Sequence, residues 1–117
     1  YYIVSGIGDC TDKKVVIPYA YDGLPIKEIG ASAFKDCTLI ENIVIPNSVI
    51  SIGEHAFYGC TSIATIIVGD GLTTIGQSAF YKCTSLQTLR VKQGTRDWWY
   101  ARLTDASIQN NVTIIEV

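Results

Sequence analysis

A repeat of 23 residues constrains the fold of this chain more than any other feature of its sequence. Cys37, Cys60 and Cys83 stand 23 residues apart, and each closes a short segment that begins with glycine and contains an alanine-phenylalanine pair. The apolar positions that follow each cysteine keep the same interval, and chance rarely holds so many positions in register over three copies. The matching positions are Ile40, Ile63 and Leu86, then Ile43, Ile66 and Leu89, then Ile45, Val68 and Val91.

Each copy of the repeat predicts one coil made of two short extended pieces. Residues 43–45 alternate inward and outward as a strand does, and Pro46 ends that strand because proline cannot donate to a ladder. A second extended piece covers residues 49–52 and leads to Gly53, which permits a turn with positive φ before one helical turn. No single coil can bury its apolar side, so coils must stack to close a core.

We expect one domain over residues 1–117 with atypical ends, as stacked repeats require. Residues 1–29 form an irregular first coil that serves as the N-terminal cap and carries about five extra residues. Residues 30–92 hold the regular repeats. The register breaks after this point, and residues 93–117 form the C-terminal cap.

The expected C-terminal cap has a helix followed by a strand. Residues 94–103 read as a helix with Thr95 at its N-cap position, and residues 112–117 alternate like a final strand. Trp98 and Trp99 are expected to cover the exposed end of the core, because aromatic residues mostly contribute burial.

The repeat resembles one variety of leucine-rich repeat, the BspA-like (Treponema-type) family. Its period lies within the range of about 20 to 29 residues that leucine-rich repeats cover. Residues 37–57 reproduce most of the family's pattern, including Ile45-Pro46-Asn47-Ser48-Val49, and residues 23–30 look like its longer first coil. The resemblance covers about residues 10–92.

This resemblance implies a β-rich leucine-rich-repeat solenoid of the α/β class. About four stacked coils would carry short parallel strands and one-turn helices, followed by the helix-strand cap. The family is typical of secreted or surface-attached bacterial proteins and some protist ones, where it is associated with adhesion. The resemblance therefore implies a module that binds host proteins or other cells.

The charge and apolar patterns exclude two classes of partner. Nine basic residues against 11 acidic ones give a net charge of −2, whereas a nucleic-acid binder needs clustered lysine and arginine. No apolar run is long enough to insert into a membrane. The chain contains no methionine, so we expect a segment of something longer or processed, with any export signal or anchor outside it.

The cysteines and the single histidine invite a chemical interpretation. The repeat cysteines are too widely spaced for a zinc site, and parallel side-chain directions are poor geometry for a disulfide. We expect a column of buried thiols, with a disulfide or a metal site as alternatives and Cys10 as the least certain member. His55 is expected at the surface, and no nucleophile or base accompanies it. No cofactor is expected.

The candidate binding surface is the outward side of the main strands. Tyr58 and Tyr81, at equivalent positions of two coils, are a second candidate. Exposed β-branched residues often mark contacts, although such residues also simply favour strands. The outward positions form two columns: Val16, Val44, Ile67 and Arg90, and Lys14, Asn42, Thr65 and Thr88.

The sequence thus predicts a non-catalytic interaction or adhesion module of a secreted or cell-surface bacterial protein, with a protein or a glycan as its partner. One alternative is a structural spacer within a larger surface protein, which would need no binding surface. A remote alternative is an enzyme, which would need a pocket with convergent titratable groups.

Overall fold

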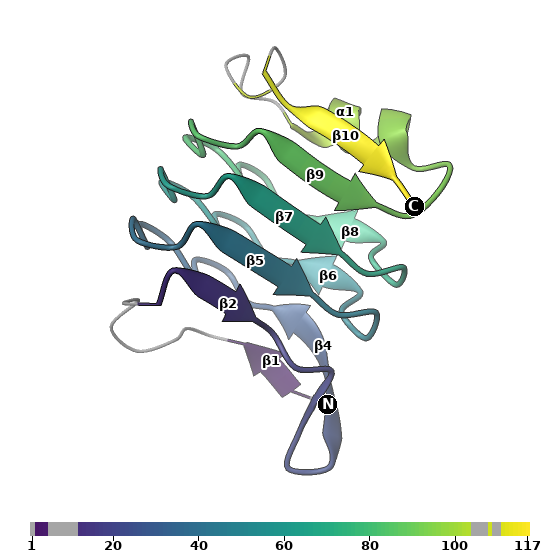
Figure 1. Ribbon diagram of the computed structural model, residues 1–117. Coiled ribbons are helices and arrows are strands. Elements are labelled where there is room, and N and C mark those ends of the chain that lie inside the picture. The colour runs from purple at the N-terminus through teal and green to yellow at the C-terminus, as the bar shows by residue number, and fades with distance from the viewer. Residues whose placement is uncertain (1, 5–11, 104–107, 109–110) are drawn as a thin grey trace.

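A computed structural model of the chain describes residues 2–4, 12–103, 108 and 111–117. The chain winds as a stack of coils, and each regular coil gives one strand to a front sheet and one to a back sheet (Figure 1). The predicted leucine-rich-repeat solenoid is therefore confirmed.

The front sheet is parallel throughout and follows the order β10-β9-β7-β5-β2. Equivalent repeat positions pair across neighbouring strands, so that Val44 stands opposite Ile67 and Ile67 opposite Arg90. The 23-residue period therefore becomes the register of the sheet. The strands are β2 (Lys14–Val16), β5 (Asn42–Ile45), β7 (Thr65–Val68), β9 (Thr88–Val91) and β10 (Thr113–Glu116).

The back sheet has the order β1-β4-β6-β8 and is also parallel along that path. Its strands are β1 (Tyr2–Val4), β4 (Leu24–Ile29), β6 (Ser51–Ile52) and β8 (Thr74–Ile75). The extra residues of the first coil form a hairpin, in which β3 (Ala20–Tyr21) pairs antiparallel with β4.

The tight turn of this hairpin has a local cause. Asp22 and Gly23 have φ angles of 52° and 79°. A two-residue hairpin turn with positive φ at both positions favours the Asp-Gly sequence found here.

A column of stacked phenylalanine rings fills the space between the sheets. The ring centroids of Phe34 and Phe57 lie 5.1 Å apart, and those of Phe57 and Phe80 lie 5.3 Å apart, with nearly parallel planes. The inward residues of the front strands complete the core, and the described residues bury no polar or charged residue there. Stacking is thus what buries each coil, as the repeat predicts.

The turn after each back strand differs from the expected helical turn. Residues 31–36, 54–59 and 77–82 form consecutive turns, and alternate amides of the first two turns donate to the next coil. Phe34 N–H, for example, donates to the carbonyl of Ala56 over 2.7 Å. A helix would direct these amides within its own coil, so the link between coils replaces it.

The glycines before these turns also have another role than predicted. Positive φ angles fall on Ser32, His55 and Ser78 instead. A Cβ atom added to Gly53 would lie 2.5 Å from the backbone nitrogen of Ala31, closer than real Cβ atoms come to backbone. The glycine is needed because two coils approach closely, not because of its φ angle.

The cysteine prediction is partly wrong. Cys60 and Cys83 are free and buried, as expected of a thiol column. Cys37 is disulfide-bonded instead. The argument from parallel side chains holds only between equivalent positions of regular coils, and Cys37 is the first such position. Cys10, the remaining cysteine, lies outside the described residues.

The tail contains helix α1 (Arg96–Arg102) and β10, close to the predicted elements. Thr95 occupies the N-cap position, but its hydroxyl donates to the carbonyl of Lys92 rather than accepting from the helix. The Trp99 side chain is only 3% exposed, and its ring lies 6.0 Å from that of Phe80. The cap role and the domain boundaries stay predictions.

Candidate functional site

The eight predicted binding residues lie on the outer side of the front sheet, which we call the strand face. Alternation along each strand turns Val15, Ile43, Ile66 and Leu89 into the core and leaves their neighbours outside. Strand pairing then aligns the outside residues in the two predicted columns. They are Val16, Val44, Ile67 and Arg90, and Lys14, Asn42, Thr65 and Thr88.

The two columns differ in chemistry. Val16 is 58% exposed and Ile67 36%, whereas Val44 between them is half-buried. Asn42, Thr65 and Thr88 are half-buried and bring an amide and two hydroxyls beside the apolar stripe. Such a mixture can exclude water over the apolar column and exchange hydrogen bonds along the polar one.

Strand β10 extends both columns by one residue, which the sequence reasoning missed. Thr113 pairs with Thr88, and Ile115 pairs with Arg90. Ile115 is 40% exposed, so the apolar column resumes beyond Arg90. The alternation of residues 112–117 indicated a strand. Its pairing with β9 could not be predicted, because the tail is out of step with the 23-residue period.

Charge is placed toward the two ends of the strand face. Lys14 and Arg90 are exposed cations, and the four residues of β5 and β7 between them in the columns are uncharged. Cations at the ends of a neutral centre favour partners with carboxylates or hydroxyls at that spacing.

Tyr58 and Tyr81, the second predicted candidate, stack on each other, and we call their surroundings the turn cluster. Their ring centroids are 5.7 Å apart. The ammonium groups of Lys35 and Lys82 lie 5.5 and 5.7 Å from the centre of the Tyr58 ring, and His55 packs edge-on against it. His55, expected at the surface, is thus half-buried. Tyr58 is half-buried among these neighbours, whereas the Tyr81 side chain is 40% exposed.

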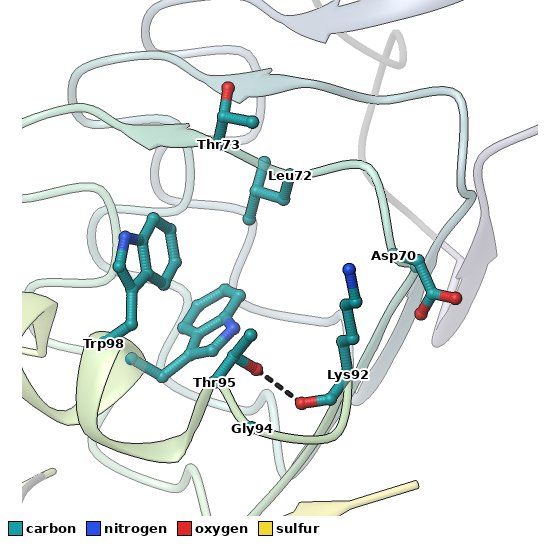
Figure 2. A pocket seen from close by; sticks show the side chains of 9 residues that line it. Asp70, Leu72, Thr73, Lys92, Gly94, Thr95 and Trp98 are labelled. Carbon is teal, nitrogen blue, oxygen red and sulfur yellow. Dashed lines mark hydrogen bonds between the residues drawn. The ribbon is translucent and has the colours of Figure 1, made fainter.

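A groove of about 410 Å³ opens at the end of the back sheet, and we call it the end groove. Leu72 and Thr73 form the solenoid side, Trp98 stands on the α1 side, and Lys92 and Asp70 lie at the other end (Figure 2). The guanidinium carbon of Arg102 lies 3.9 Å from the ring centre of Trp98 and holds that ring in place. The sequence alone did not indicate this groove.

Two further classes of site were sought in the described part of the chain. Its histidine, cysteine and carboxylate side chains form no group of three or more that could hold a metal ion. None of its helices is long and apolar enough to cross a membrane.

Comparison with known proteins places this geometry in a family. The family model described as BspA type leucine rich repeat region matches residues 27–117 in six copies. The crystal structure of a leucine-rich repeat protein from T. pallidum is similar, with 32% identity and a TM-score of 0.70 over 91% of this chain. No curated protein is similar enough to count as a match.

Two other solved structures share the fold. One is a leucine rich cell surface protein from Faecalibacterium prausnitzii, with 25% identity and a TM-score of 0.59 over 90% of this chain. The other is a leucine-rich repeat protein from Bacteroides capillosus, with 24% identity, a TM-score of 0.67 and 88% of this chain covered. This chain covers 52%, 26% and 77% of the T. pallidum, F. prausnitzii and B. capillosus proteins, respectively. The repeat, the stacked coils and the match over residues 27–117 together show that the chain belongs to the BspA-type leucine-rich repeat family.

Proposed function

We propose that the chain is a non-catalytic protein-binding module of a secreted or surface-attached bacterial protein, and that it binds through the strand face. The observation that carries the proposal is the uncovered pair of columns. Val16 and Ile67 stay exposed although the same coils bury the inward residues almost completely. Apolar surface left open in register over several strands favours a contact with another protein.

The location outside the cell is supported by two observations. Cys37 is disulfide-bonded, and disulfides persist mainly in oxidising environments such as the cell surface and the periplasm. The similar protein from F. prausnitzii is described as a cell surface protein.

The modest size of the strand face fits an adhesive role in which several weak contacts act together. The columns span five strands, and a face of this kind buries a limited area against one partner. The chain spans about half the length of the T. pallidum protein, so further coils in a parent protein would add avidity.

The test starts with the capture of a partner. Wild-type protein is immobilised and exposed to extracellular-matrix and bacterial-surface extracts, and a captured protein is identified and purified. Its Kd is then measured against wild type and against the double variant Val44→Asp with Ile67→Asp. Two carboxylates in the centre of the apolar column should weaken binding at least about 100-fold, because each buries an unpaired charge.

A matched control carries the same charge change elsewhere. Leu39 and Ile50 are exposed apolar residues outside the two columns, so Leu39→Asp with Ile50→Asp should bind like wild type. Equal weakening in both double variants would point to net charge rather than the face. Unchanged binding in both would rule the strand face out, and failure to capture any protein would favour the spacer role.

A further inference from the structure

The two edge strands of the front sheet differ in how they are protected. At one edge, β2 begins with the exposed Lys14, follows the exposed Lys13 and is succeeded by Pro18. Lysine and proline are residues with which proteins keep an edge strand from pairing with another chain. At the other edge, β10 has the sequence Thr-Ile-Ile-Glu and is followed by Val117, so it holds neither.

The one charge of β10 is used by helix α1. The side chain of Glu116 is 19% exposed, and its Oε2 accepts hydrogen bonds from the amides of Gly94 and Arg96. A carboxylate engaged in this way does little to repel a strand that approaches the edge. The edge of β10 is therefore the less protected of the two.

The hydrogen bonds of β10 show which of its backbone groups face the open side. The amides of Thr113 and Val117 donate toward β9, over 2.7 and 3.0 Å. Backbone groups alternate in direction along a parallel strand, so the amides and carbonyls of Ile114 and Glu116 point away from β9. No described strand pairs with that side of β10 (Figure 1).

The pairing of β10 with β9 shows how a further strand would be held. The carbonyls of Gln87 and Val91, four residues apart, accept the first and last of the printed bonds from the β10 segment. By the register of the two strands, the equivalent carbonyls one strand further on are those of Val112 and Glu116. They offer the same spacing to the amides of another parallel segment.

A groove of about 330 Å³ lies along this edge, and we call it the β10 groove. Val112, Thr113 and Ile114 line it on the strand side, and Arg96 and Tyr100 line it on the helix side. Its volume lies in the size range of ligand sites, roughly 300 to 1,000 Å³. Because Ile114 points to the core side of the sheet, a strand added to β10 would direct alternate side chains into this groove.

The helix beside the edge decides which kind of partner fits. Helix α1 lies behind β10, with the Arg96 side chain 57% exposed and Tyr100 44% exposed (Figure 1). A second copy paired through β10 would place its own α1 only one strand spacing away, about 4.8 Å, whereas packed helices need about 8 to 10 Å between their axes. A single extended segment brings no such helix.

We propose that the β10 edge and the β10 groove bind an extended peptide segment of a partner protein, which adds to β10 as a further parallel strand. Main-chain hydrogen bonds would supply the affinity, and the groove would select the side chains. The site is separate from the strand face, and the inference does not depend on the proposed function.

The groove predicts the sequence that fits. In the register of the sheet, the residue beside Ile114 points into the groove toward Tyr100, so an apolar side chain suits this place. Two residues further along, a side chain would lie at the Arg96 end of the groove. An acidic residue suits this second place, because the guanidinium is largely exposed and its contact with Glu116 is long, at 3.9 Å.

The probe is the peptide Ser-Thr-Val-Thr-Glu-Val-Ser with blocked ends, and its first valine is designed to stand beside Ile114. Amide signals of isotope-labelled protein are followed by NMR during the titration. We expect the amides of Ile114 and Glu116 to shift to saturation and to exchange more slowly with solvent. The amides of Thr113 and Val117 are already bonded toward β9, so they should change much less.

Two methylated probes form a matched pair. In the parallel register the amide of the second threonine donates to the carbonyl of Ile114, whereas the amide of the glutamate points away from β10. Methylation of the threonine amide should weaken binding about tenfold or more. The same methylation of the glutamate amide should leave the Kd within about twofold, since it removes no bond to β10.

Two further comparisons test the groove and its independence from the strand face. A probe with lysine in place of glutamate should bind about threefold to fivefold more weakly, and Arg96→Ala should abolish this preference. The double variant Val44→Asp with Ile67→Asp should bind the probe like wild type. Equal losses from the two methylations, or no shift at millimolar probe, would overturn the proposal. Shifts of the β10 amides that follow protein concentration without probe would assign the edge to a second copy instead.

Discussion

The thiol of Cys60 donates a hydrogen bond to the carbonyl oxygen of Phe34 in the preceding coil, with 3.0 Å between sulfur and oxygen. Cys83 repeats this contact with Phe57 over 3.1 Å. Burial disfavours the charged thiolate and raises the pKa of Cys60 from 9.0 to about 11, against the lowering effect of the hydrogen bond from the Cys37 backbone. Cys60 therefore links its coil to the preceding one as a neutral thiol.

The raised pKa of Cys60 predicts that the fold weakens between pH 9 and 11. In that window the unfolded chain loses the thiol proton while the folded chain keeps it, so the free energy of unfolding falls as pH rises. The loss reaches about 2 to 3 kcal/mol at pH 11 and is absent below pH 9. Urea unfolding at pH 8 and pH 10.5 measures it. Cys60→Ala should lose less stability than wild type over this interval, and an equal loss would contradict the prediction.

The middle phenylalanine should dominate the stability of the core. Phe57 is fully buried and stacks on both Phe34 and Phe80. Phe57→Ala should lower the free energy of unfolding by about 3 to 5 kcal/mol, because it leaves a cavity between two rings. Tyr81→Ala, on a ring that is 40% exposed, should cost about 1 kcal/mol or less. Similar urea midpoints for the two variants would mean that the ring column does not support the stack.

Periodicity predicted the strand face well because a solenoid turns sequence period into sheet register. Once three copies align, Val44 has to stand opposite Ile67, and this pairing is confirmed. The same reasoning could not place Ile115, whose strand follows a segment of different length. Whether these residues bind a partner stays a prediction.

Features that depend on distances between coils could not be predicted from the sequence. The disulfide at Cys37 was not predicted, because the repeat argument compared only equivalent positions of regular coils. The end groove arises where the chain departs from the repeat after Lys92. A repeat predicts only the positions that recur, so it gives no information about segments outside the repeats.

The two roles of small residues in the turns predict opposite effects of substitution. Gly53→Ala should destabilise by more than about 2 kcal/mol, because its Cβ atom would meet the backbone of Ala31 and two coils would have to separate. Ser32→Gly should stabilise by about 0.5 to 1 kcal/mol, because the exposed Ser32 has a φ angle of 59° that costs a residue with a Cβ atom more than glycine. Thermal unfolding of both variants measures the difference. A stabilising Gly53→Ala would show that the coils can separate without loss.

The carboxylate of Glu116 should fix helix α1 to the solenoid. Its Oε2 accepts hydrogen bonds from the amides of Gly94 over 2.6 Å and Arg96 over 3.2 Å, at the N-terminal end of the helix. Glu116→Ala should therefore cost about 1 to 2 kcal/mol. Arg96→Ala should cost less, because its contact with Glu116 is long, at 3.9 Å, and the Arg96 side chain is 57% exposed.

Hydrogen exchange of the amides in residues 94–102 separates the role of Glu116 from a general loss of stability. We expect Glu116→Ala to speed exchange in this segment more than in β5 and β7. The amides of these central strands should change only as much as the global free energy of unfolding changes. Glu116→Gln retains an acceptor oxygen but no charge, so it should fall between wild type and Glu116→Ala. If exchange rose equally in the helix and in the central strands, Glu116 would support the whole stack and not the helix alone.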